Sequence, residues 1–203
     1  MKKSCLKYSG FIYFGLIIIS AVLHWFMITN YPTISNIINY VSTLILSVII
    51  AFLIGVALYN ENKNLILGVF IFSTAIGIIQ SISSMMNVMR VYPSMWIENL
   101  LIFLFPISLS IIVLIGLIFI HKRFGQWIVI IAKLIVIIHT LYIGVLFLMN
   151  RQLNPVSLRL YSLFNALITL YISVLLIWVV LHYFYKPSYS KIAQSESSDI
   201  SFE

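Results

Sequence analysis

Long uninterrupted apolar runs are the feature that most constrains the fold of this chain. Runs rich in Ile, Leu, Phe and Val, each about twenty residues long, alternate with short polar stretches, and an α-helix of that length crosses the hydrocarbon of a bilayer. Barrel strands would instead alternate apolar and polar residues. With 62% hydrophobic and 8% charged residues, the chain also has too little polar surface to fold as a water-soluble domain.

These runs predict an all-α, multi-pass transmembrane bundle of six helices joined by short loops. The predicted spans are 11–28, 40–59, 65–86, 100–120, 127–149 and 161–185. They divide the chain into an N-terminal segment, a transmembrane domain and a polar tail that we expect to be disordered and cytoplasmic, at 1–10, 11–185 and 186–203.

A proline precedes each even-numbered span, at Pro32, Pro93 and Pro155. This spacing suggests a possible pseudo-repeat of three helical hairpins, a pattern that is common in transport proteins. Equal span lengths would produce the same spacing without any repeat, since proline suits the first turn of a helix. Both interpretations stay open at this point.

The distribution of basic residues predicts the orientation, because short loops rich in Lys and Arg stay on the cytoplasmic side. The side that holds both termini carries eight: Lys2, Lys3, Lys7, Lys63, Lys122, Arg123, Lys186 and Lys191. The other side carries three: Arg90, Arg151 and Arg159. We therefore predict a cell-membrane protein with both termini in the cytoplasm. The net charge of +7 follows from this asymmetry and does not indicate nucleic-acid binding, because no basic run is interleaved with aromatic residues.

The third predicted helix carries small and polar residues on one face, in its span and directly after it: Ser73, Gly77, Gln80, Ser84 and Asn87. This face must turn away from lipid. It either lines a path for a solute or ion, with Gln80, Ser84 and Asn87 as the candidate residues, or forms a seam of interhelical hydrogen bonds worth ~0.6 kcal/mol each. We favour the packing interpretation.

Two further spans carry small residues every three or four positions. The second has Thr43, Ser47, Ala51 and Gly55, and the sixth has Ser162, Ala166, Thr169 and Ser173. Small residues at this spacing let membrane helices approach closely. We predict that both seams serve helix packing.

Lys133 is the one basic residue within a predicted span, and no acidic residue lies within any of them. The sequence places it near the cytoplasmic start of the fifth span, so its long stem can carry the ammonium back to the headgroups. Otherwise the ammonium must be neutral or face a wet cavity, with Thr140 and Gly144 on the same face. In that case Lys133 and Thr140 are candidate residues of a solute or ion pathway.

The four histidines form two pairs of similar depth in the predicted topology, His24 with His139 and His121 with His182. Bis-axial ligation of haem b would need one histidine on each side of the macrocycle. Satisfied structural histidines are the simpler interpretation, because an imidazole is also at home near a membrane interface.

No catalytic constellation is found. The sequence contains neither HExxH nor GxSxG, and the single cysteine, Cys5, excludes a Cys-based zinc site. We expect neither an enzyme nor a metal site. The favoured function is a transport-related or accessory membrane subunit that contacts lipid and possible partner subunits; the alternatives are a haem-binding redox protein and a structural or regulatory partner of a membrane complex.

Overall fold

The computed structural model describes residues 3–28, 34–91, 96–149 and 156–185, and within these ranges it contains helices and no strand. The helices are α1 (Lys3–Ile28), α2 (Ile34–Tyr59), α3 (Lys63–Val91), α4 (Trp96–Ile118), α5 (Arg123–Met149) and α6 (Val156–Val179), and α6 continues into a π-helical turn, η2 (Val180–Phe184). The predicted all-α bundle of six helices is confirmed.

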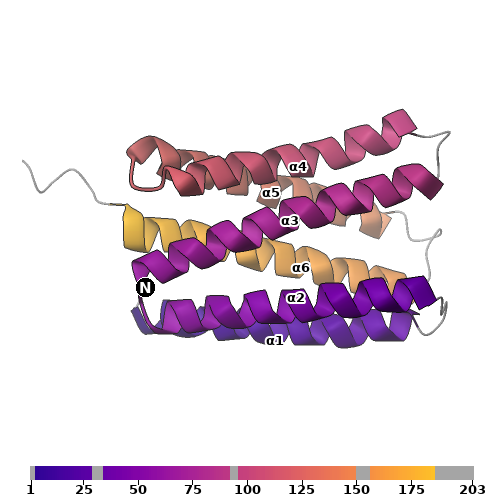
Figure 1. Ribbon diagram of the computed structural model, residues 1–203, viewed down its shortest axis with the longest axis horizontal. Helices are drawn as coiled ribbons and strands as arrows, with labels where there is room; N and C mark the ends of the chain where they lie inside the picture. Colours follow the sequence, from indigo (N-terminus) through magenta and orange to yellow (C-terminus); the bar gives the residue numbers. More distant parts are fainter. Residues whose placement is uncertain (1–2, 29–33, 92–95, 150–155, 186–203) are drawn as a thin grey trace, which may run out of the picture.

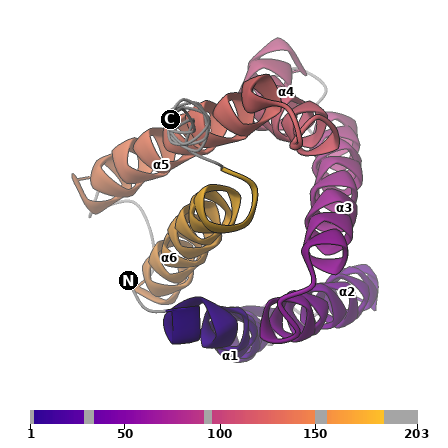
Figure 2. The same cartoon turned by 90° about the vertical axis from the view of Figure 1, so that its left-hand side faces the viewer.

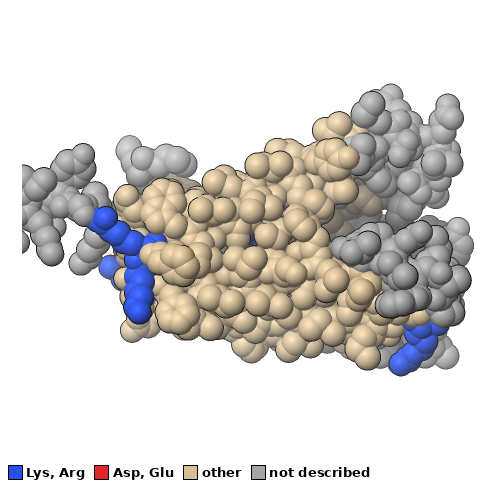
Figure 3. All heavy atoms as spheres, turned by 90° about the horizontal axis from the view of Figure 1, so that it is seen from above, with Lys and Arg blue, Asp and Glu red and all other residues tan. Residues whose placement is uncertain are grey.

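The helices have the length and surface of membrane spans. Five of them are long and apolar enough to cross a membrane, and the shorter apolar part of α4 is Phe103–Ile118. Every helix exposes large apolar side chains, for example Ile18, Ile45, Phe72, Ile112, Ile138 and Val174. In the face drawn in Figure 3, Lys and Arg gather at the two ends of the molecule and the broad middle is almost entirely uncharged. A surface of this kind is stable in hydrocarbon, where the backbone is satisfied within each helix.

Several helices extend beyond the predicted apolar runs. The structure begins α1 at Lys3 rather than at residue 11, and Leu6 and Ser9 are buried in this first part of the helix. Helices α2, α4, α5 and α6 also begin four to six residues earlier than predicted. Hydropathy marks only the part of a helix that lies in hydrocarbon, whereas packing against neighbours continues the helix into the interface. The tail at 186–203 and the three loop prolines, Pro32, Pro93 and Pro155, lie outside the described residues, so the pseudo-repeat stays a prediction.

The six helices form a ring. Each packs against its neighbours in sequence, and α1 also packs against α6, which closes the ring. Figure 1 shows the helices aligned along the long axis of the molecule, and Figure 2 shows the arrangement from one end, with α6 between α1 and α5. Short connections favour antiparallel neighbours, so the chain order alone accounts for most of this arrangement.

Buried side chains are confined to one half of the bundle along the helix axes. Every buried residue among the described side chains lies within six short segments, at 6–10, 50–58, 66–70, 107–120, 125–132 and 168–180. All six segments lie toward the end at which α1, α3 and α5 begin. We call this the packed end, and the opposite end the open end, where the described side chains are all half-buried or exposed.

Glycines bring backbones together at the packed end. A Cβ atom added to Gly10 of α1 would lie 2.6 Å from the Cα atom of Gly55 in α2. In the α4–α5 hairpin, a Cβ atom on Gly125 would overlap the carbonyl group of Phe119, and one on Gly116 would lie 2.7 Å from a methyl group of Val129. Only glycine permits these approaches.

Polar contacts tie the turns and helix ends together at the packed end. Asn62 caps α3, since its Oδ1 accepts hydrogen bonds from the backbone N–H groups of Asn64 and Leu65 at 3.1 and 3.2 Å. Buried Gln126 of α5 donates from Nε2 to the carbonyl oxygens of Ile120 and Phe184 at 3.0 and 2.9 Å, and so connects the α4–α5 turn to the end of α6.

Candidate functional site

Three pockets lie in the open half of the ring, and each is lined by several polar side chains. We name them after the helices that line them: the α1–α2–α6 pocket, of about 180 Å³, the α2–α3–α4 pocket, of about 730 Å³, and the α5–α6 pocket, of about 360 Å³. Their lining residues lie in the segments 17–24, 43–47, 77–88, 103, 139–144 and 162–169. Among the lining residues of these three pockets, only Ile168 is a buried core residue.

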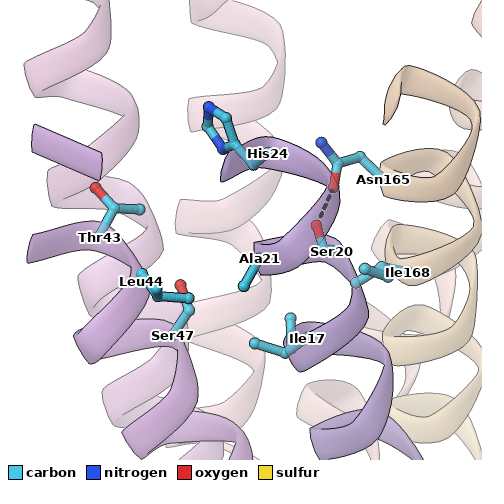
Figure 4. A pocket seen from close by; sticks show the side chains of 9 residues that line it. All are labelled: Ile17, Ser20, Ala21, His24, Thr43, Leu44, Ser47, Asn165 and Ile168. Carbon is cyan, nitrogen blue, oxygen red and sulfur yellow. Dashed lines mark hydrogen bonds between the residues drawn. The ribbon is translucent and has the colours of Figure 1, made fainter. Parts of the chain in front are cut away.

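The α1–α2–α6 pocket is lined by side chains that come from three helices (Figure 4). Ser20 of α1 donates a hydrogen bond of 2.9 Å from Oγ to Oδ1 of Asn165 in α6. Thr43 and Ser47 of α2 lie across the pocket from this pair, and His24 lies one turn of α1 farther toward the open end. The pocket therefore combines hydroxyl, amide and imidazole groups within apolar helices.

Of these three, the α2–α3–α4 pocket has the largest volume, and it contains the polar face predicted in the third span, apart from Ser73. Gln80, Ser84 and Asn87 all line it, together with Gly77. None of these side chains makes a hydrogen bond in the part of the chain that the structure describes, whereas Ser81 donates to the carbonyl oxygen of Gly77 at 2.8 Å. Unpaired amide and hydroxyl groups are costly in hydrocarbon but inexpensive in a water-filled space.

The α5–α6 pocket contains the predicted Thr140 and Gly144. Across from them, α6 contributes Ser162, Thr169 and Asn165. Thr140 donates from Oγ1 to the carbonyl oxygen of Val136 at 2.8 Å, and Thr169 donates to that of Asn165 at 3.0 Å. Each threonine has thus used its only proton within its own helix, so that toward the pocket it offers hydrogen-bond acceptors.

Shared residues connect the three pockets into one polar wall. Thr43 lines both the α1–α2–α6 and the α2–α3–α4 pocket, and Asn165 lines both the α1–α2–α6 and the α5–α6 pocket. Five of the six helices contribute polar groups to this wall, and α4 contributes Phe103. The polar wall therefore runs around the open half of the ring.

Lys133 lies below the α5–α6 pocket and faces away from lipid. The lipid-exposed stripe of α5 consists of Ile131, Leu134, Ile138, Tyr142 and Val145, and on a helical wheel Lys133 falls on the opposite side. It is half-buried and forms no ion pair or hydrogen bond within the described residues. Because α5 begins at Arg123, Lys133 is ten residues into the helix, about 15 Å at the usual rise. This placement argues against snorkelling along the lipid surface, but Lys133 is not among the residues that line the three pockets, so its role in a pathway stays a prediction.

The histidines predicted as pairs lie in different surroundings. His24 lines the α1–α2–α6 pocket and His139 the α5–α6 pocket, where its ring centroid is 4.8 Å from that of Phe105. At the packed end, His121 is 6.0 Å from the ring of Phe184, and His182 is 4.9 Å from the ring of Tyr183. Helices α1 and α5 are separated by α6 in the ring. Haem ligation by these residues stays a prediction.

The two small-residue seams are only partly packing seams. In α2, Ala51 and Gly55 pack closely as predicted, but Thr43 and Ser47 of the same ridge line pockets. In α6, Ser162, Ala166 and Thr169 line the α5–α6 pocket, and only Ser173 is fully buried. In their open halves the two seams line pockets, so the prediction that both seams serve packing is confirmed only for their packed halves.

Sequence reasoning overlooked Ser20 and Asn165, which connect α1 to α6 across the pocket wall. A signal existed for Asn165, since an amide inside an apolar span is costly unless it has a partner or faces water. No cluster of three or more His, Cys, Asp or Glu side chains suited to a metal ion occurs within the described ranges.

Comparison with models of protein families, with curated proteins and with solved structures finds no match to this chain.

Proposed function

We propose that this chain is a transport-related membrane protein, either a small carrier or the solute-receiving subunit of a larger assembly. The observation that carries the proposal is the polar wall shared by the three pockets, which lies at the open end of an otherwise apolar bundle. Unpaired Gln80 and Asn87 are too costly to keep in lipid without a role, and in a water-filled vestibule they can bind a polar solute.

The contrast between the two ends supports a bundle that is open on one side. Transporters expose a site near the middle of the membrane to one side at a time. Here apolar residues from all six helices close the packed end, among them Leu6, Ile54, Ile66, Leu117, Val129 and Val179. A vestibule that ends on a packed plug has the form of a resting state accessible from one side.

Charge supports the assignment of the two sides of the cell membrane. By their positions in the described helices and turns, Lys3, Lys7, Lys63, Lys122 and Arg123 lie at the packed end, whereas Arg90 and Arg159 lie at the open end. By the positive-inside rule the packed end faces the cytoplasm, so the vestibule opens to the outside.

Thiol labelling tests the vestibule directly. In a Cys5→Ser background, Ser84→Cys and Thr140→Cys place single thiols in two pockets, and Ile79→Cys, on the exposed apolar face of α3, is the matched control. We expect a membrane-impermeant methanethiosulfonate, added outside sealed cells, to label both pocket thiols at least about tenfold faster than the lipid-facing one, because only a hydrated thiol ionises. Equal labelling at all three positions would remove the basis of the proposal.

Haem b binding by His24 and His139 is the alternative, and the adjacency of their pockets at Asn165 is the observation in its favour. A Soret band in protein purified after haem-supplemented expression, lost in His139→Ala, would support it.

A further inference from the structure

We propose that the α2–α3–α4 pocket binds a neutral polyhydroxylated solute of the size of a sugar or a sugar alcohol. This proposal rests on the proposed function and names the class of solute. It is carried by three features of the pocket: polar side chains without partners, a lining without charge, and an apolar wall opposite the polar one.

The polar side chains without partners are the first feature. Gln80, Ser84 and Asn87 line the pocket, and none of them makes a hydrogen bond within the described part of the chain. On a helical wheel they lie away from the lipid-exposed stripe of α3, to which Ile79 and Met86 belong. The three residues extend over about 10 Å of helix. A ligand must therefore carry several polar groups to satisfy all of them.

Hydroxyl groups match these side chains best. Each of the two amides offers N–H donors and a carbonyl acceptor, and the hydroxyl of Ser84 can donate or accept. Ser81 also lines the pocket, and because its proton is bonded to the carbonyl oxygen of Gly77, it adds an acceptor. A hydroxyl group of the ligand both donates and accepts, so it can pair with any of these groups.

The lining without charge is the second feature. No Lys, Arg, His, Asp or Glu is among the described residues that line the pocket. Arg90 follows Asn87 by one turn, but it is exposed and does not belong to the lining. An ion that left water for this pocket would lose hydration without gaining a counter-charge from these residues, which is costly. The pocket therefore favours a neutral solute over an anion or a cation.

The apolar wall is the third feature. Phe103 of α4 and Val88 of α3 line the pocket together with the polar side chains. The C–H groups of a polyol can pack against such a wall while its hydroxyl groups form hydrogen bonds. The volume of about 730 Å³ lies within the range of roughly 300–1,000 Å³ that is usual for small-molecule sites. The pocket thus has room for a six-carbon polyol.

Protection of a pocket thiol from labelling tests the proposal. In the Cys5→Ser background, Val88→Cys places a thiol in the pocket without removing a polar group, and Thr140→Cys places one in the α5–α6 pocket as the control. A bound solute should slow the reaction of the first thiol with the impermeant methanethiosulfonate in a saturable way. The concentration that halves the rate gives an apparent Kd, and the control thiol should react at an unchanged rate.

The probes are three six-carbon polyols that differ at one end: sorbitol is neutral, gluconate is an anion and N-methylglucamine is a cation. Glycerol, with three hydroxyl groups, is the fourth probe. We expect sorbitol to protect the Val88→Cys thiol, and both charged polyols to need at least about a tenfold higher concentration, because they must lose the hydration of a charge. Glycerol should also protect less well than sorbitol, since it is too short to reach all three unpaired side chains.

Further substitutions in the Val88→Cys protein assign the effect to the residues. Ser84→Ala and Ser73→Ala form a matched pair, because both serines lie on one face of α3 and only Ser84 lines the pocket. Ser84→Ala should raise the apparent Kd for sorbitol about threefold, and Gln80→Leu about tenfold, since each removes hydrogen bonds to the ligand. Ser73→Ala should leave it unchanged. Gln80 and Ser84 make no hydrogen bond within the described structure, so these substitutions should not impair folding.

The proposal is overturned if sorbitol does not protect the Val88→Cys thiol or protects the Thr140→Cys thiol equally. It is also overturned if either charged polyol matches sorbitol, or if Ser73→Ala weakens protection as much as Ser84→Ala. The proposed vestibule survives these outcomes as long as the pocket thiols are still labelled from outside. Pocket thiols that are not labelled at all would refute the vestibule itself, so the two failures can be told apart.

Discussion

The packed end and the open end of the ring are built from the same six helices, yet they differ in how closely the helices pack and in what their small residues contact. At the packed end, glycines bring backbones into contact, and side chains from all six helices are buried. At the open end, the small and polar residues border pockets, and a Cβ atom on Gly77 or Gly144 would meet no atom within 4 Å.

The two ends of the ring contribute differently to the stability of the bundle. Close packing and internal hydrogen bonds stabilise membrane bundles, since lipid offers no hydrophobic drive between helices. The packed end therefore holds the ring together, and the open end is free to present polar groups. Substitutions of the same type at the two ends should accordingly have different effects on the free energy of unfolding, measured by titrating purified protein in mixed micelles with SDS.

The largest contrast is expected between two glycines of α5. Gly125→Ala should destabilise the protein by about 3 kcal/mol, because its Cβ atom would overlap the backbone of Phe119, which cannot move aside as a side chain can. Gly144→Ala should be neutral or stabilising by up to about 1 kcal/mol, since it adds a better helix former in open space. Equal losses at both positions would show that the open half packs as tightly as the other.

Two glutamines give the next contrast. Gln126→Leu removes the donor to the carbonyl oxygens of Ile120 and Phe184 and should cost about 2 kcal/mol. The same substitution at Gln80, which has no hydrogen-bond partner in the described structure, should change the free energy of unfolding by less than about 0.5 kcal/mol. A large loss at Gln80 would mean that its amide is a structural donor.

The smallest contrast concerns two serines of the polar wall. Ser20→Ala loses the hydrogen bond to Asn165 and should cost ~0.6 kcal/mol, whereas Ser84→Ala, which loses no hydrogen bond, should be neutral. The free-energy cost of Ser20→Ala also shows whether the α1–α2–α6 pocket contains water. In a wet pocket, a water molecule can donate to Asn165 in place of the lost hydroxyl, and the cost stays small. A cost above about 2 kcal/mol would indicate that Asn165 is left unpaired in a dry space.

Much of the fold was predictable because hydropathy and chain order act locally. Six apolar runs predict six helices, and short loops make successive helices neighbours. The polar face of Gln80, Ser84 and Asn87 was also visible, since helical periodicity places these residues together whatever surrounds them. Periodicity alone left open whether this face packs or lines a path, and we favoured packing; the structure shows that the three residues line a pocket.

Other features of the site could not be predicted. The ridge of Thr43, Ser47, Ala51 and Gly55 has one spacing and one residue class along its length, but its two halves have opposite environments. Lys133 likewise appeared near enough to the interface to snorkel until the start of α5 and the exposed stripe of that helix were known.

By itself the sequence determined the solvent, the element type and the polar face of the third helix, because these depend on transfer free energy and on a fixed helical period. Only the tertiary structure decided where the helices touch and where they diverge. Whether two helices touch at a given level depends on the angle between their axes. A small residue suits both cases, because it permits a close contact between helices and also leaves room for a pocket.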